Sequence, residues 1–97
     1  MPKPGYVYLL SSQRGGTLYI GVTSNLAQRI WQHREGLVDG FTGKHGVNRL
    51  VYIEAFDDIE AAIAREKAMK KWRRRWKIDA IEGQNPEWRD LYGDIQR

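Results

Sequence analysis

Two short runs with strand composition, separated by a five-residue segment that holds two glycines, constrain this chain more than any other feature. The runs span residues 5–11 (GYVYLLS) and 17–22 (TLYIGV), and both are rich in β-branched and aromatic residues. Gly15 and Gly16 between them tolerate the positive φ that tight turns need. The pattern predicts an antiparallel hairpin. A turn centred near Gln13 or Arg14 sets Tyr8 roughly opposite Tyr19, so that both phenols share one face of the sheet.

A helix is predicted directly after the hairpin. Ser24 or Asn25 is suited to cap it, apolar residues at helical spacing continue it to about residue 35, and Gly36 ends it. Arg29 and His33 are four residues apart, so they lie one turn from each other on the same face. Residues 36–46 hold four glycines and show no hydrophobic period. They are expected to form a mobile surface loop that carries Phe41, Lys44 and His45.

The second half of the chain predicts one more strand and mostly helix. Residues 48–56 have strand composition, and Asp57 or Asp58 is suited to cap a helix after them. Another helical stretch is expected to begin after Met69 and to end at Gly83. Asn85 and Pro86 form a cap and first-turn pair for a short last helix that docks on the domain. The order β-β-α-β-α-α indicates an α+β protein in which helices cover a small sheet.

The length and composition favour a single small domain. Ninety-seven residues leave little room for a second core, so the domain is expected to span residues 1–97, with its centre at about 5–81 and a helical extension at 82–97. The absence of cysteine excludes disulfides, thiolate metal sites and cysteine nucleophiles. Residues 1–5 do not begin a signal peptide, and no apolar run reaches the length of a membrane span. The expected protein is therefore soluble and cytoplasmic, with no membrane partner and no small-molecule cofactor.

The strongest charge feature is a basic segment that we define as residues 65–77. It contains eight Lys or Arg residues and one acid, Glu66, and the net charge of the whole chain is +4. Phosphate backbones attract such a segment, and Trp72 and Trp76 within it offer faces on which unpaired bases stack. The alternative is a solvated helix face whose tryptophans pack on the core. The residues expected to contact phosphates are Lys70, Lys71, Arg73, Arg74 and Arg75.

Glu66 occupies an unusual position in the predicted second helix. At 100° per residue it lies within the apolar stripe that includes Ile59, Ala62 and Met69. An ionised carboxylate is costly there unless it is paired or binds a cation. One interpretation is a salt bridge to an arginine at the edge of the core. The other is a carboxylate in a cleft that binds magnesium or manganese.

Four more residues are candidates for chemistry. Arg29 is suited to donate hydrogen bonds to a phosphate oxygen, although a single helix arginine has little specificity. His33 is more often packed or exposed than catalytic. Tyr8 and Tyr19 are by composition ordinary strand tyrosines. A phenol with a pKa near 10 is a poor base at neutral pH, so either tyrosine needs help from a metal or an arginine.

These residues resemble the motifs of the GIY-YIG nuclease family. Tyr6-Val7-Tyr8 stands in the place of the first motif, and Tyr19-Ile20-Gly21 matches the second. Arg29 follows at the spacing of the family's arginine, and Glu66 stands in an Arg-Glu-Lys-x-x-Lys-Lys helix like the family's metal-binding glutamate. The resemblance covers about residues 5–81, and it is strongest to the small stand-alone bacterial members.

The resemblance implies a three-stranded antiparallel sheet with flanking helices and a metal-dependent endonuclease, acting in DNA repair or processing. Tyr8 and Tyr19 would activate and orient water, Arg29 would hold the scissile phosphate, and Glu66 would bind a single Mg²⁺ or Mn²⁺. His33 would contact phosphate in a secondary role, and Gly21 would let the backbone approach the substrate. DNA is the expected partner, and RNA stays open.

Two departures from the family pattern favour a slower or more restricted enzyme. A bulky Tyr6 replaces the first glycine, and Val22 stands where some members have a lysine. The competing hypotheses are a nucleic-acid-binding module with weak or no catalysis and a protein-interaction domain anchored by tryptophans. Binding that does not weaken steeply with salt would favour the interaction domain. Its anchors would be Trp72, Trp76 and Trp88.

Overall fold

The computed structural model describes residues 3–37 and 46–96. Most of the loop predicted at 36–46, with Phe41, Lys44 and His45, lies outside the described residues. In the part that is described, no helix has the length and apolar character needed to cross a membrane.

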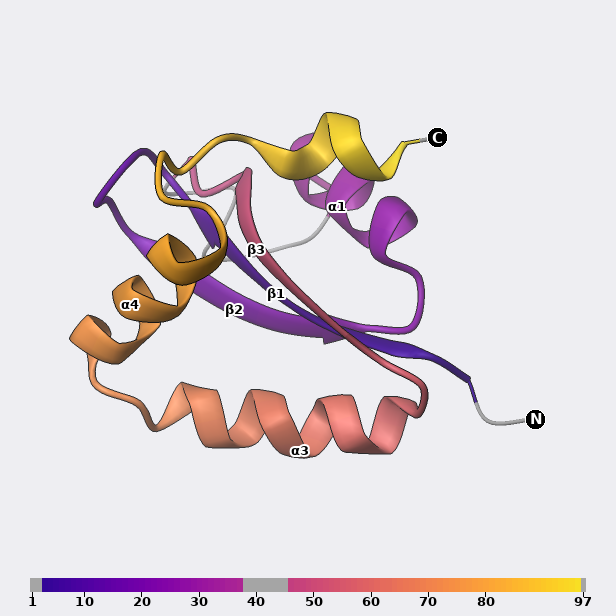
Figure 1. Ribbon diagram of the computed structural model, residues 1–97. Coiled ribbons are helices and arrows are strands. Elements are labelled where there is room, and N and C mark those ends of the chain that lie inside the picture. The colour runs from indigo at the N-terminus through magenta and orange to yellow at the C-terminus, as the bar shows by residue number, and fades with distance from the viewer. Residues whose placement is uncertain (1–2, 38–45, 97) are drawn as a thin grey trace.

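The fold is an α+β arrangement around one three-stranded antiparallel sheet, which confirms the predicted fold class. The strands are β1 (Gly5–Ser11), β2 (Leu18–Thr23) and β3 (Arg49–Phe56), and they pair in the order β2-β1-β3. Strand β1 is therefore central, with β2 and β3 at the edges (Figure 1). Its residues are bulky and apolar, as expected for a strand that is covered on both faces.

The hairpin register differs from the predicted one by two residues. Tyr8 pairs with Gly21, and Leu10 pairs with Tyr19. The turn is centred one residue later than expected: the backbone N–H of Gly16 donates to the carbonyl of Gln13 at 2.9 Å, and Gly15 adopts a φ of 69°. Because side chains alternate with a period of two, this shift keeps both tyrosines on the same face.

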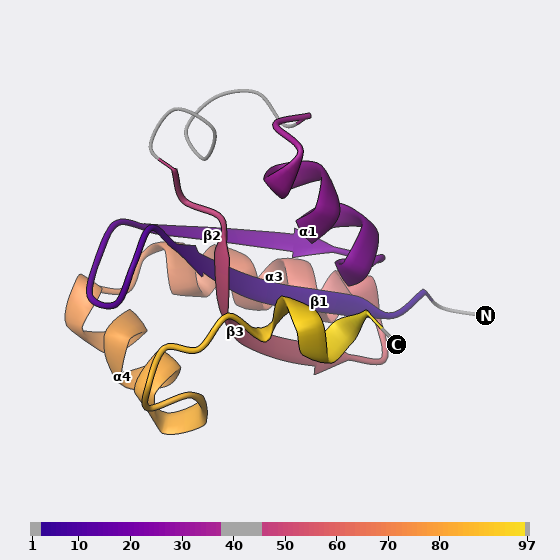
Figure 2. The same ribbon diagram turned by 90° about the horizontal axis from the view of Figure 1, so that it is seen from above.

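The helices lie on opposite faces of the sheet. Helix α3 (Ile59–Lys70) packs under β1 and β2, and α4 (Arg74–Gln84) follows it. Helix α1 (Leu26–Arg34) and the 3-10 helix η1 (Leu91–Ile95) cover the other face, with α1 near β2 and η1 near β3 (Figures 1 and 2). The predicted caps form: Asn25 accepts a hydrogen bond from the N–H of Gln28, and Asp58 accepts one from the N–H of Glu60.

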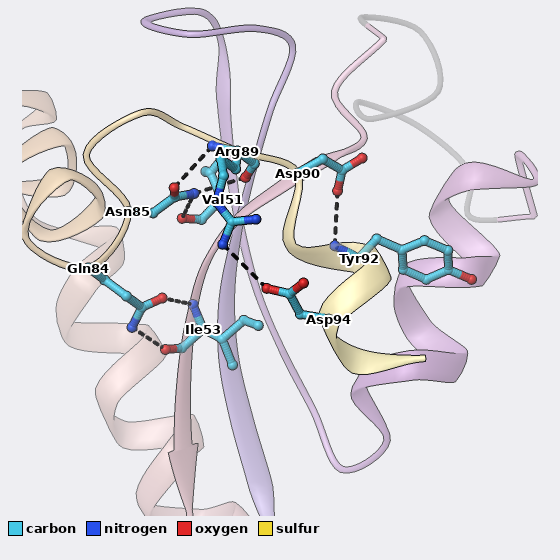
Figure 3. Close-up of polar contacts among 8 residues, drawn as sticks. All are labelled: Val51, Ile53, Gln84, Asn85, Arg89, Asp90, Tyr92 and Asp94. Carbon is cyan, nitrogen blue, oxygen red and sulfur yellow. Dashed lines mark hydrogen bonds and ion pairs between the residues drawn. The ribbon is translucent and has the colours of Figure 1, made fainter. Parts of the chain in front are cut away.

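The C-terminal segment does dock on the domain, but its helix begins later than predicted. Asn85 does not cap a helix at Pro86: its side chain accepts from the N–H of Arg89 and donates to the carbonyl of Val51 (Figure 3). The cap of η1 is Asp90, which accepts from the N–H of Tyr92 at 3.1 Å. The Asn85 side chain is thus used to hold the chain against β3.

A neighbouring amide covers the edge of β3 itself. The side chain of Gln84 accepts from the N–H of Ile53 at 2.9 Å and donates to the carbonyl of the same residue at 2.7 Å (Figure 3). These are the two backbone groups that a further strand would use. The end of α4 therefore protects this edge from pairing with another chain.

Two apolar clusters fill the space on either side of the sheet. The first lies between the sheet and the α3–α4 layer, and the second lies on the side of α1 and η1. Alternate residues of β1 supply them, because successive side chains point to opposite faces. The first cluster contains Val7, Leu9, Ile20, Val51, Tyr52, Ala62, Met69, Ile81 and Trp88, and the second contains Tyr8, Leu10, Leu26, Ile30, Val47, Leu50 and Leu91.

Candidate functional site

The site is built around Tyr8, whose side chain is almost entirely buried in the middle of the sheet. Its ring lies across the neighbouring strand at Gly21. A Cβ atom at Gly21 would lie 2.4 Å from both Cζ and Oη of Tyr8, which is far inside van der Waals contact. The glycine of the Tyr19-Ile20-Gly21 motif therefore has a structural role in this chain, because only glycine leaves room for the phenol. Sequence reasoning assigned Gly21 an approach to substrate and did not find this contact.

Tyr8, Tyr19 and His33 form a compact group of rings. The ring centroids are 6.4 Å apart for the two tyrosines, 5.8 Å for Tyr8 and His33, and 5.4 Å for Tyr19 and His33. Both pairs with histidine meet edge to face, a favourable geometry for aromatic rings. Strands β1 and β2 and helix α1 each contribute one ring.

A hydrogen bond joins the phenol of Tyr8 to the imidazole of His33, with 3.0 Å between Oη and Nε2. Burial, and then the charge of Arg29, lowers the pKa of His33 to about 4, so the imidazole is neutral at neutral pH. Burial also raises the pKa of Tyr8 to about 12, although a hydrogen bond from Arg29 opposes the shift. The pair is thus uncharged in the resting protein at neutral pH, with Nε2 of His33 within hydrogen-bond distance of the phenol.

Arg29 places a positive charge beside this group. It lies one helical turn before His33 on α1 and is partly exposed. Its guanidinium donates to the side chain of Gln32 at 3.3 Å, and it acts on the phenol of Tyr8 in the direction that lowers the pKa of that group. A guanidinium has five donors, so these contacts leave donors for a further anion.

Glu66 lies on α3, which packs on the face of the sheet opposite to α1. It is 7% exposed although it is ionisable, and its charge acts on the phenol of Tyr8. Its carboxylate pairs with Lys70 one turn later on α3, with 2.8 Å between Oε2 and Nζ. The sequence left open a salt bridge between Glu66 and an arginine, but the partner in the structure is a lysine. The i, i+4 spacing of Glu66 and Lys70 was the signal in the sequence that could have revealed the pair.

The donors fit a metal that keeps most of its water. Among the described residues, no three carboxylate or histidine side chains gather around one point. A site with Glu66 alone suits Mg²⁺ or Mn²⁺ completed by water and phosphate oxygens, since Mg²⁺ commonly takes only one or two carboxylates from the protein. It does not suit zinc, which usually takes at least three protein ligands.

The residues expected to bind phosphate are all exposed, but four of them already have partners. Lys70 pairs with Glu66, and Arg75 pairs with Asp79 at 3.1 Å. Arg74 donates to the carbonyls of Gly15 and Gly16 in the β1–β2 turn, at 2.8 and 2.6 Å. The guanidinium of Arg73 lies 5.1 Å from the centre of the Trp76 ring. Arg74 therefore has a structural role that charge patterning did not indicate.

The sequence also missed the contacts that hold α1 in place. Asp90 forms an ion pair with Arg34 at the end of α1, and it accepts from the N–H of Leu50 in β3 at 3.4 Å. The Arg34 guanidinium stacks 4.3 Å from the ring centre of Tyr92. The helix that carries Arg29 and His33 is thus tied to the C-terminal segment. Nothing in the local sequence pairs Arg34 with a residue so far along the chain.

Comparison with known proteins assigns the family. A model described as the GIY-YIG catalytic domain matches residues 4–79. The chain belongs to the GIY-YIG family, which is a family of nucleases that generally use a divalent metal. A nuclease family implies a nucleic-acid substrate.

The relatives are small proteins of similar length. The chain is similar to a UPF0213 protein of Clostridium perfringens, with 36% identity over 80 residues that cover 82% of this chain and 85% of the relative. It is 32% identical to a UPF0213 protein of Oceanobacillus iheyensis, covering 90% of this chain and all of the relative. It also matches the solution NMR structure of a UPF0213 protein from Bacillus halodurans, with a TM-score of 0.56, 30% identity, and 91% and 93% of the two chains covered.

Proposed function

We propose that this protein is a metal-dependent endonuclease that hydrolyses phosphodiester bonds in nucleic acid, with DNA as the preferred substrate, in repair or processing. The observation that carries the proposal is the group formed by Tyr8, Tyr19, His33 and Arg29, on whose central phenol Glu66 also acts. Strands β1 and β2 and helix α1 supply the group, and helix α3 on the opposite face of the sheet supplies Glu66. Such a convergence of proton-transfer groups, a cation and a buried carboxylate is typical of a hydrolytic site.

Proton transfer in this site would run through Tyr8 to His33. A neutral phenol with a pKa of about 12 can take a proton from water only as it gives up its own, and Nε2 of His33, 3.0 Å away, is placed to receive that proton. Because the pKa of His33 is about 4, the imidazole would hold the proton only transiently. The water oxygen forms the new bond to phosphorus, and the bond to the leaving ester oxygen breaks. The leaving oxygen would take a proton from solvent water, and His33 would release its proton to solvent, back through Tyr8. Tyr19, at ring distance from both, would orient the water.

Arg29 and Glu66 would manage the negative charge of the phosphate. Arg29 would donate to a non-bridging oxygen, where charge grows as the new bond forms. Glu66 would hold the divalent cation, which supplies positive charge at the phosphate when it is bound. Lys70, its partner at 2.8 Å, would balance the carboxylate while no cation is present.

A cleavage assay tests the proposal. Labelled single-stranded, duplex and branched DNA and RNA would be incubated with the protein in magnesium, in manganese and in chelator. We expect a metal-dependent product that falls by about 100-fold or more in Arg29→Ala, as for other lost charge-stabilising donors. Arg89→Ala, an exposed arginine paired with Asp94, should cleave like the parent. The absence of product in every substrate and metal would overturn the proposal.

Glu66→Gln tests the metal assignment separately from the fold. Because Lys70 is largely exposed, losing the pair should leave it solvated, and the variant should fold about as well as the parent. Cleavage and the shift of Tm with magnesium or manganese should both be lost, while nucleic-acid binding survives. Glu87→Gln, an exposed glutamate, is the control. A strongly destabilised Glu66→Gln variant that still cleaves would refute the metal-ligand role.

The second candidate function is a nucleic-acid-binding module with little or no catalysis. The exposed basic residues at the end of α3 and in α4 favour it, because they support binding whether or not the site is active. A binding titration at several salt concentrations, run beside the cleavage assay, separates the two functions. Salt-sensitive binding without any metal-dependent product in the parent protein would select the binding module.

A further inference from the structure

A surface hollow lies beside the basic segment and away from the tyrosine group. It has a volume of about 440 Å³ and is lined by Trp72, Trp76, Asp79 and Ala80. This volume falls within the range of roughly 300–1,000 Å³ that is usual for ligand sites. The last three residues lie three and four positions apart on α4, so they share one face of that helix. Trp72 joins them from the connection between α3 and α4.

The two indoles form adjoining walls of the hollow. Their centroids are 6.3 Å apart and the ring planes meet at 78°. A planar ring stacked on one indole would therefore direct its edge at the other, a favourable arrangement for aromatic groups. Trp76 is 50% exposed, so part of its indole is accessible at the surface. Unlike Trp31, which is 46% exposed on α1, it lies against a second indole at a hollow of the size that ligands occupy.

The charges around the hollow indicate what it takes. The guanidinium of Arg65 lies 5.0 Å from the centre of the Trp72 ring, and that of Arg73 lies 5.1 Å from the Trp76 ring. Arg65 already pairs with Glu54 at 2.8 Å, so Arg73 and its basic neighbours are the cations that suit the phosphates of a nucleic-acid strand. Asp79, in contrast, lines the hollow itself and would repel a phosphate. Its pair with Arg75 is exposed on both sides and weak, so the carboxylate can accept from the N–H groups of a base.

The position of the hollow suits a strand that also reaches the tyrosine group. Trp72 follows Glu66 by six residues, which limits the distance between their Cα atoms to about 22 Å even in an extended chain. Arg74 fixes the start of α4 against the β1–β2 turn, beside the end of β2 that carries Tyr19. These contacts connect the start of α4 to the hairpin that carries Tyr19.

We propose that this hollow binds one unpaired base of the substrate strand, stacked on the indoles of Trp72 and Trp76, with Asp79 accepting from the donors of the base. The inference rests on the proposed function and adds a substrate class to it: strands with unpaired bases near the cut. A duplex cannot offer a base to the hollow without unstacking and unpairing it, which is unfavourable. Flaps, loops and single strands can place an unpaired base in the hollow while the phosphate to be cut lies at the tyrosine group.

Binding measured in chelator, so that nothing is cleaved, tests the proposal. Fluorescence anisotropy would follow a labelled single-stranded oligonucleotide and the same sequence as a blunt duplex. We expect Trp76→Ala to weaken single-strand binding by on the order of 10-fold, the usual effect of losing a stacked base, and duplex binding by less than about 2-fold. Trp76→Phe should retain most of the single-strand affinity because it keeps an aromatic face. Trp31→Ala, which removes a tryptophan that is 46% exposed on α1, should behave like the parent.

The outcomes separate this inference from the proposed function. Equal single-strand binding by the parent and Trp76→Ala, in a protein that still cleaves, would overturn the hollow as a base site and leave the nuclease in place. Equal losses on single strand and duplex would also overturn it, since they indicate a general surface contact. A parent protein that neither binds nor cleaves any nucleic acid would overturn both. The base site would be supported if Trp76→Ala weakens single-strand binding while its duplex binding, and the binding of Trp31→Ala, stay close to those of the parent.

Discussion

The two faces of this sheet are made from alternate residues of the same strand, yet they differ in kind. On the α3–α4 side, β1 contributes Val7 and Leu9, which are fully buried among apolar neighbours. On the α1 side it contributes Tyr8 and Leu10, and the phenol of Tyr8 meets a buried histidine. A single pleated strand thus supplies packing to one face and candidate chemistry to the other.

The electrostatics of the two faces differ in degree: burial raises the pKa of Tyr52 in the α3–α4 cluster, but the largest pKa shifts lie on the α1 face. The pKa of His33 falls to about 4 and that of Tyr8 rises to about 12, in both cases first because of burial. Keeping titratable groups in such surroundings costs stability that an apolar residue would not lose. The α3–α4 cluster, dominated by aliphatic side chains, is expected to supply the stability that the other face gives up.

Gly21→Ala should have the largest effect, because it damages the α1 face alone. The new Cβ would lie 2.4 Å from the Tyr8 phenol, so the ring must move away from His33. We expect cleavage to fall by about 100-fold or more, with a loss of about 1–3 kcal/mol in the free energy of unfolding. Gly83→Ala is the matched control: its Cβ meets nothing within 4 Å, and alanine favours the helix. A Gly21→Ala protein with parental activity would contradict the assignment of the chemistry to the α1 face.

Met69→Ala tests the opposite face. Met69 is fully buried in the α3–α4 cluster, and its truncation should lower the free energy of unfolding by about 2–5 kcal/mol. Chemical denaturation would measure this loss. At a temperature where the variant is folded, its cleavage rate should stay within about threefold of the parent. A folded Met69→Ala protein without activity would show that the two faces do not divide stability and chemistry as described.

The pH dependence of stability gives a smaller, sharper test of the α1 face. His33, packed near Tyr8, Tyr19 and Arg29, has a pKa lowered from 6.5 to about 4, so the unfolded chain binds more protons between these values. Its contribution to stability is therefore present above about pH 6.5 and is lost as pH falls toward 4, by up to about 3 kcal/mol. Urea unfolding of the parent and of His33→Gln across this window should show the extra slope only in the parent. Parallel curves would contradict the buried, neutral imidazole.

Much of the fold followed from patterns within short segments. Strand composition, the Asn25 and Asp58 caps and the glycine after α1 predicted most of the elements and the fold class. The register was wrong by two residues because a turn that holds two glycines can be centred at several places. The last helix was misplaced because Asn85 bonds to β3, and that strand lies more than thirty residues earlier.

The sequence named candidate site residues but not the contacts among them. Motif spacing named Tyr8, Tyr19, Arg29 and Glu66, and their roles stay predictions. The Tyr8–His33 hydrogen bond spans 25 residues and depends on how α1 packs, which no local pattern encodes. The need for glycine at position 21 depends on the register, so it became visible only with the paired strands.

The most direct test of the division between the faces is to remove a single oxygen atom from β1. Tyr8→Phe and Tyr6→Phe each delete one hydroxyl from a tyrosine that belongs to or packs on the α1-side cluster, two residues apart on the strand. Single-turnover cleavage in magnesium would be compared for the two variants, with circular dichroism to show that both are folded. Loss of about 100-fold or more in Tyr8→Phe, with Tyr6→Phe within about threefold of the parent, is the predicted result. Parental cleavage by Tyr8→Phe would contradict the account.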